Sequence, residues 1–329
     1  MLATHASRTI VAALTGVVAL TFAIVDAKVA FAQETRPIQF IVGYSPGGGT
    51  DILARVLAEA ITKTTGRTVV VRNVPGAGGQ IAASALLRDG GDGLSVLAIN
   101  HPDLMLAAAR GDAPFKASDF QVIMVDLQDP RVMLVKADSD IDSFTTFVKR
   151  AQAQPGKLAV SVTAAGGQEL FAKWLFGRLG LDVTIVGYKG GAEASTALLA
   201  GDVQATIGDD FARFNLRDRT KALLVASQRK SPRWPEAPTL TSALAPLGVV
   251  PPTPDFMSRY GLYVVPSAVK TNNPAAYASL QQMLLKARSA PEFQAYLATS
   301  KLDDLSIGKT GEALDRVLSA DMAEIAKIK

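Results

Sequence analysis

Glycine clusters stand at four places where this chain has the means to hold an anion. Each place has the same order: a strand-like apolar run, a glycine doublet or triplet, and then a helical pattern. Consecutive glycines permit a sharp turn, expose backbone N–H groups and direct the positive N-terminal end of a helix beyond the strand. Two such places in each half of segment 40–191 predict two similar lobes that share one cleft. The clusters are Gly47-Gly48-Gly49, Gly78-Gly79, Gly166-Gly167 and Gly190-Gly191.

The first turn, Tyr44–Asp51, has the sharpest local motif, YSPGGGTD. Successive N–H groups in such a turn form a concave nest that binds anions. The alternative is an ordinary strand-to-helix turn with Asp51 as the N-cap. The segment matches neither GxxxxGK[ST] nor GxGxxG, and no cofactor is expected. The residues expected to contact a ligand here are Tyr44, Ser45, Gly47, Gly48, Gly49 and Asp51.

Polar residues at the ends of later strands are expected to complete the site. Asn100 and His101 follow the run Leu94–Ile99, and Asp209 follows Val203–Ile207. Ligands of open α/β sheets bind beyond the carboxyl ends of the strands. Asp209 and the adjacent Asp210 are at odds with an anion site, unless one of them caps a helix or meets a cationic group of the ligand. The expected contacts from these strands and from the third glycine turn are Asn100, His101, Thr163, Gly166, Gly167, Gln168 and Asp209.

The residues needed for catalysis and for metal binding are scarce. Cysteine is absent, and His101 is the only histidine beyond His5 in the leader. A thiolate site, a cysteine nucleophile and a cluster of histidine ligands are therefore excluded, and no metal is expected. A Ser-His-Asp triad would have to use His101, yet no GxSxG elbow occurs. We predict binding without catalysis; a hydrolase that uses the same cleft is the alternative.

Residues 1–32 have the pattern of a signal peptide. A basic start at Arg8 precedes the apolar run Ile10–Val25, and Ala30-Phe31-Ala32 offers small residues for cleavage. The apolar run is about 16 residues long, short of the ~20 that span a bilayer. We predict cleavage before Gln33 and export to a bacterial periplasm, with an uncleaved anchor as the alternative.

The composition indicates a globular binding protein. Hydrophobic residues make up 48% of the chain and charged residues 19%, which is typical of a chain with a large core. The net charge of +4 is spread along the sequence without a Lys/Arg cluster. Binding of nucleic acid is not expected, because it requires a concentrated basic face.

Strand-like and helical runs alternate along the chain, which predicts an α/β fold with a mainly parallel sheet in each lobe. Asp129-Pro130 stands between two strand-like runs at the first crossing between lobes, and Tyr260–Val265 is the second crossing strand. We expect the last helix, Thr310–Ile328, to pack on the first lobe. The expected division is 33–127 for the first part of lobe 1, 128–258 for lobe 2, and 259–329 for the remainder of lobe 1.

Five motifs make the chain resemble the tripartite tricarboxylate transporter receptors, the Bug-type periplasmic solute-binding proteins. Their order and spacing cover nearly the whole mature chain. The resemblance implies a two-lobed, hinged periplasmic binding protein fold (type II-like) with the ligand between the lobes. The motifs are IVGYSPGGGTDILAR at Ile41–Arg55, VVVRNVPGAGG at Val69–Gly79, PGKL at 155–158, GYKG at 187–190 and SPRWPEAPTL at Ser231–Leu240.

Two stretches that are expected to face the first glycine turn depart from the family pattern. Gly167, Gln168 and Leu170 replace a Thr/Ser-rich stretch followed by His, and Asn100-His101 replaces a Thr-Ser pair. The resemblance implies a receptor for a small organic acid. We expect it to present the acid to a membrane permease and to be a monomer. A receptor that signals to a membrane sensor is the alternative.

Overall fold

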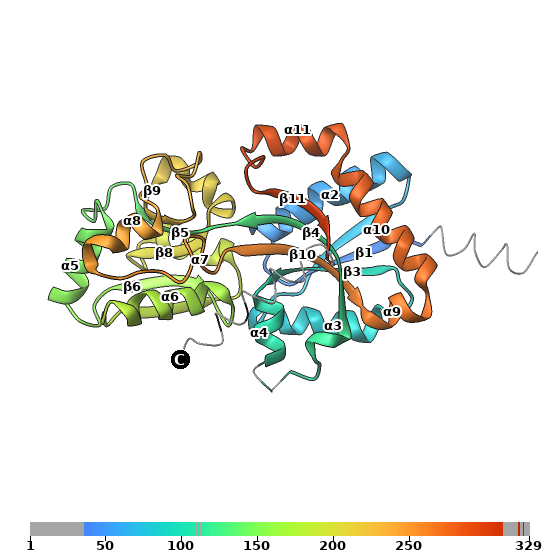
Figure 1. Cartoon of the computed structure of the whole chain (residues 1–329), viewed down its shortest axis with the longest axis horizontal. Helices are drawn as coiled ribbons and strands as arrows, with labels where there is room; N and C mark the ends of the chain where they lie inside the picture. Colours follow the sequence, from blue (N-terminus) through green and yellow to red (C-terminus); the bar gives the residue numbers. More distant parts are fainter. Residues whose placement is uncertain (1–35, 110, 112, 312–321, 323–324, 326–329) are drawn as a thin grey trace, which may run out of the picture.

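The computed structural model describes residues 36–109, 111, 113–311, 322 and 325. The predicted leader lies outside these residues. Within them, no helix is both long enough and apolar enough to cross a membrane, and no cluster of three or more His, Asp or Glu residues could hold a metal ion. Two lobes lie side by side and are joined by extended strands (Figure 1).

The first lobe is built on a six-stranded sheet of order β11-β4-β10-β3-β1-β2. Every residue of β3 is buried, and so is every residue of β1 except Gln39, in keeping with their content of branched apolar residues. The strands are β1 (Ile38–Val42), β2 (Val69–Asn73), β3 (Ser95–His101), β4 (Phe120–Asp129), β10 (Arg259–Pro266) and β11 (Ser306–Thr310). The helices around this sheet are α2 (Gly49–Thr65), α3 (Gln80–Asp89), α4 (Asp103–Ala109), α9 (Ser267–Asn272), α10 (Pro274–Arg288) and α11 (Pro291–Thr299).

The second lobe repeats the same plan around a five-stranded sheet of order β7-β6-β8-β5-β9. Its strands are β5 (Arg131–Lys136), β6 (Ala159–Thr163), β7 (Thr184–Tyr188), β8 (Ala205–Asp209) and β9 (Thr220–Ala226). Its helices are α5 (Phe144–Ala153), α6 (Gly167–Arg178), α7 (Gly191–Ala200) and α8 (Leu240–Leu244), with a 3₁₀ segment at Phe211–Arg219. The trio β2-β1-β3 corresponds to β7-β6-β8, and the lobes are similar, as the glycine repeats predicted.

Pairing of the strands corrects one expectation. Within the described residues, four strand pairs are parallel and five are antiparallel, so the sheets are mixed rather than mainly parallel. The antiparallel pairs all involve β4, β5, β9, β10 or β11. Strands β4, β5 and β10 carry the chain between the lobes (Figure 1). Of these, β10 runs antiparallel to β3 in the first sheet and β5 runs antiparallel to β8 in the second, against the direction of the strand–helix units. The alternation of strands and helices identifies only those units.

The C-terminal part differs from its predicted course. Strand β11 stands at Ser306–Thr310, where only a loop and the start of a helix were expected. Met322 and Ile325 pack with the core of the second lobe, which includes Trp174 and Phe256. The predicted return of the final segment to the first lobe is therefore wrong for these two residues. Their apolar spacing predicted a buried face correctly, but a spacing does not specify which core the face meets.

Candidate functional site

A small cavity of about 20 Å³ lies between the lobes. This is about the space of one water molecule, so the two lobes are closed on one another. The cavity lies at the first turns of α2, α6 and α7, whose N-terminal N–H groups lack partners within the helix. Its lining residues are Tyr44, Gly48, Gly49, Thr50, Asn100, Asp103, Arg131, Thr163, Gln168, Gly191, Asp209, Ala212 and Arg213.

The turn Tyr44–Asp51 is held in shape by Asp51. The Asp51 carboxylate accepts hydrogen bonds from the Gly47 N–H at 2.9 Å and from Arg55 and Asn73. Burial opposes its charge, yet these three donors lower the pKa of Asp51. Gly47 has φ +79°, a conformation that favours glycine. Asp51 thus supports the turn from within, and it does not line the cavity.

The glycine turns of the two lobes meet one another directly. Ser45 Oγ donates to Glu193 Oε1 across the cleft at 2.8 Å. A Cβ atom on Gly190 would lie 2.9 Å from the backbone N of Ser45, and one on Gly78 would lie 2.3 Å from the carbonyl oxygen of Ala165. Absence of side chains at these turns therefore lets the lobes close.

Asp209 stands at the end of β8, where the sequence predicted it, but arginines surround it. It forms a buried ion pair with Arg131, accepts a hydrogen bond from Gln168 Nε2 at 3.1 Å, and lies 3.5 Å from Arg259 Nε. Gln168 Oε1 in turn accepts from the Thr163 N–H at 2.9 Å. The carboxylate is thus already matched with internal cations, and this resolves the contradiction of an acidic group in an anion site.

Asn100 lies in a similar polar cluster at the end of β3. Its side-chain oxygen accepts hydrogen bonds from Thr50 Oγ1 at 3.1 Å and from Arg259 Nη1 at 3.2 Å. Arg259 also donates to Asp129 at 2.9 Å. Burial raises the pKa of Asp129 to about 6, against the attraction of Arg259 and with repulsion from Asp209 and Asp210.

Arg213 is a cation of the cavity that has no ion-pair partner among the described residues. Its side chain is 1% exposed, and its Nε and Nη2 have no hydrogen-bond partner within the described residues. It lies against Gly191 and Gly208, where an added Cβ would come within 2.5 and 2.4 Å of its guanidinium. Burial lowers the pKa of Arg213, while Asp209 and Asp129 raise it; a guanidinium stays charged in proteins. The site therefore presents a buried positive charge beside two helix N-termini.

His101 lies in β3 rather than beyond it, and its ring is fully buried with its edge towards Tyr260. It does not line the cavity. Burial, with a smaller contribution from Arg131, lowers the pKa of His101 to about 4. The strand was expected to end at Ile99 and instead continues through His101. Side chains alternate between the two faces of a strand, so Asn100 lines the cavity and His101 points into the protein.

This pKa predicts a pH dependence of stability. Between pH 6.5 and 4 the unfolded chain binds a proton at His101 that the folded chain does not, so stability falls as pH falls. The loss from pH 7 to 4 amounts to about 3 kcal/mol. We expect urea unfolding to show that the stability difference between wild type and His101→Gln changes by this amount over that range. A constant difference at all pH values would contradict the burial of a neutral imidazole.

Thirteen residues were predicted from the sequence, and the structure separates them into two groups. Those that line the cavity are Tyr44, Gly48, Gly49, Asn100, Thr163, Gln168 and Asp209. Those that do not are Ser45, Gly47, Asp51, His101, Gly166 and Gly167. The lining residues that sequence reasoning missed are Thr50, Asp103, Arg131, Gly191, Ala212 and Arg213.

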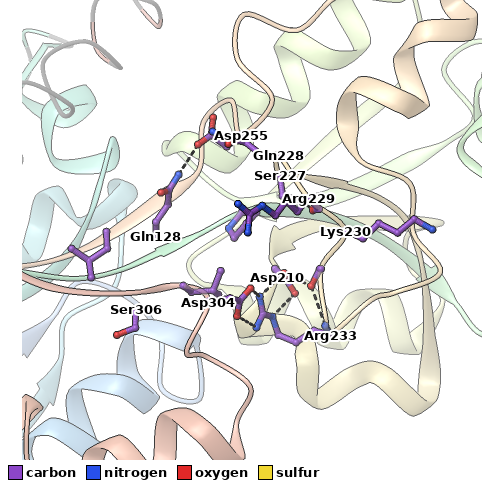
Figure 2. A pocket seen from close by; sticks show the side chains of 14 residues that line it. Gln128, Asp210, Ser227, Gln228, Arg229, Lys230, Arg233, Asp255, Asp304 and Ser306 are labelled. Carbon is purple, nitrogen blue, oxygen red and sulfur yellow. Dashed lines mark hydrogen bonds and ion pairs between the residues drawn. The ribbon is translucent and has the colours of Figure 1, made fainter.

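A larger cavity of about 380 Å³ lies beside the crossing strands (Figure 2). Its acidic groups are already paired: Arg233 holds Asp210 and Asp304, and Gln128 donates to Asp255 at 2.9 Å. The side chains of Arg229 and Lys230 are exposed. The smaller cavity differs in that it contains Arg213, a buried cation whose Nε and Nη2 lack a hydrogen-bond partner in the described part of the chain.

Comparison with known proteins agrees with this architecture. The model of the tripartite tricarboxylate transporter family receptor matches residues 53–309. The chain belongs to this family. BugT of Bordetella pertussis is 31% identical over 246 residues, which are 73% of this chain and 76% of BugT. The resemblance inferred from the five motifs is thereby confirmed.

Solved structures confirm the predicted two-lobed periplasmic binding protein fold. An R. palustris protein solved with adipate is 23% identical, covers 89% of this chain and 96% of its own, and has a TM-score of 0.77. MatC from Rhodopseudomonas palustris with bound malate is 18% identical, covers 89% of this chain and 98% of its own, and has a TM-score of 0.76. At these identities the likeness establishes the fold.

Proposed function

We propose that this protein is a periplasmic receptor that binds the carboxylate of a small organic acid between its lobes and delivers the acid to a tripartite tricarboxylate-type permease. Family membership supports the receptor role. The adipate and malate bound by two structural neighbours agree with a carboxylate ligand. The protein acts as a monomer and performs no chemistry on its ligand.

The burial of the Arg213 guanidinium, with no partner for its Nε and Nη2 among the described residues, is the observation that carries the proposal. A buried charge without a partner costs several kcal/mol, and this cost is recovered when an opposite charge arrives. A carboxylate offers two oxygens that match the guanidinium fork. Charge-assisted hydrogen bonds contribute ~1.5–3 kcal/mol each, and the ends of α2 and α7 add a smaller attraction. At the upper ends of these ranges, two hydrogen bonds and two helix ends together give the ~8 kcal/mol of a micromolar complex.

Closure of the cavity implies that the ligand enters an open form. A cavity of about 20 Å³ has no room for even a short acid. The lobes must therefore separate at the crossing strands and close again around the ligand. A permease that recognises the closed, loaded form would then distinguish it from the open one.

Calorimetry on protein exported with its own leader tests the proposal. Mono- and dicarboxylates of two to six carbons are titrated beside the matched neutral amides and a set of neutral sugars. We expect at least one carboxylate to bind with a Kd of about 10 μM or tighter, and its amide to bind at least about 100-fold more weakly. Binding of sugars alone, or equal affinity for acid and amide, would refute a carboxylate receptor.

A further inference from the structure

One anion position of the cleft is occupied by the protein itself. Asp103 belongs to α4 in the first lobe, and its Oδ1 accepts a hydrogen bond at 2.6 Å from the Gly167 N–H, which opens α6 in the second lobe. Its Oδ2 accepts from Tyr44 Oη at 2.7 Å. Asp103 is 5% exposed and lines the cavity. A side-chain carboxylate thus lies where a helix N-terminus attracts an anion.

The turn before α6 is shaped to receive this carboxylate. A Cβ atom on Gly166 would lie 2.8 Å from the Cγ and from both oxygens of Asp103. A Cβ on Gly167 would lie 3.0 Å from the ring of Pro102, which precedes Asp103. A larger residue at Gly166 would therefore push the Asp103 carboxylate away from the helix end, and one at Gly167 would clash with Arg131, whose Nη2 would lie 2.5 Å from the added Cβ.

The charges that line the cavity can pair with one carboxylate of a ligand. Its charged residues are Asp103, Arg131, Asp209 and Arg213. Arg131 is paired with Asp209, and Asp103 is bound by Tyr44 and Gly167. Arg213 alone, within the described part of the chain, presents a buried guanidinium to the cavity without a partner. A second carboxylate on the ligand would face Asp103 and Asp209, and like charges in such a site are strongly repelled.

We propose that Asp103 makes this receptor selective for monocarboxylates, because its side chain occupies the second anion position of the cleft. The inference rests on the proposed carboxylate function. A short acid with a single carboxylate binds Arg213 and leaves the contact between Asp103 and α6 intact. A dicarboxylate has to displace Asp103 or place its second charge beside it.

The test compares butyrate with succinate and hexanoate with adipate by calorimetry at pH 7.5. In wild type we expect each monocarboxylate to bind at least about tenfold more tightly than its dicarboxylate partner. Asp103→Ala removes the internal carboxylate and should lower this preference at least about tenfold, mainly through tighter dicarboxylate binding. Asp103→Asn fills the same space without the charge and should recover less than half of that change. Asp103→Ser replaces the alanine variant if the latter does not fold.

The outcomes separate the two proposals. Failure of all monocarboxylates and dicarboxylates to bind wild type refutes the carboxylate function itself. Carboxylate binding in wild type with an unchanged preference in Asp103→Ala refutes selectivity by Asp103 alone. An equal change in the alanine and asparagine variants refutes occupation of the position. It would show that the charge of Asp103, and not the space that its side chain fills, excludes the dicarboxylate.

Discussion

Replacement of Arg213 by glutamine is expected to weaken binding of the carboxylate at least about 100-fold and, at the same time, to leave the protein as stable as before or more stable. The loss of affinity follows from removal of two charge-assisted hydrogen bonds. The stability follows from the burial of Arg213, whose Nε and Nη2 have no partner in the described structure, because a buried unpaired charge destabilises the folded state. Calorimetry and urea unfolding measure the two effects.

Arg217→Gln is the matched control for this variant. Arg217 lies in the same 3₁₀ segment, pairs with Glu236 at the surface and lies over the ring of Trp234, and it does not line the cavity. Its replacement should leave affinity unchanged. Arg213→Lys keeps the charge without the planar fork and should retain part of the affinity. A structural role for Arg213 would appear instead as a loss of stability with affinity preserved.

The glycine turns and the strand–helix units were predictable because they depend on local chemistry. Glycine at a strand end and apolar residues at helical spacing specify a turn and a buried face within a few residues of chain. The same local signals placed Gly48, Gly49 and Gln168 at the cavity. They placed Gly47 and Asp51 there as well, but the Gly47 N–H is bound by Asp51 inside the turn.

The arginines of the site were not predictable in this way, because their burial depends on the meeting of two lobes. Arg213 stands in a polar stretch with Arg217 and Arg219, which by itself is typical of a solvated surface. Arg131 and Arg259 gave a clearer signal: each is the first residue of a strand next to a crossing between lobes. A charged residue that begins an apolar strand next to a crossing between lobes is a candidate for a side chain in the cleft.

From the sequence, the glycine turns were expected to expose N–H groups to a ligand, and the structure adds a steric reason for their lack of side chains. Gly49 and Gly191 line the cavity, and an added Cβ there would lie 2.7 Å from Ala212 Cβ and 2.5 Å from Arg213 Nη1, respectively. Gly190 does not line it, and its φ of −166° is open to any residue. The lack of a side chain there is required by the opposite lobe, since an added Cβ would lie 2.9 Å from Ser45 Cβ and 3.0 Å from Ser45 Oγ.

Gly190→Ala should therefore prevent full closure and weaken ligand binding about 10- to 100-fold, although no ligand contact is removed. The apparent affinity of a hinged receptor falls with the fraction of molecules able to close. The methyl group also separates Ser45 from Glu193, whose hydrogen bond joins the lobes at 2.8 Å. Since neither lobe core is altered, the free energy of unfolding should change by less than about 1 kcal/mol. Small-angle X-ray scattering should give a larger radius of gyration for the variant than for wild type.

Gly177→Ala supplies the control, because a Cβ at Gly177 in α6 meets no atom within 4 Å. This substitution should preserve affinity and raise stability by up to about 1 kcal/mol, since alanine favours a helix over glycine. Wild-type affinity in Gly190→Ala would mean that the lobes bind ligand without the close contact between their glycine turns. Weakened binding with an unchanged radius of gyration would place the effect of Gly190 on the ligand itself. Only the combination of weak binding and an expanded shape supports closure through glycine.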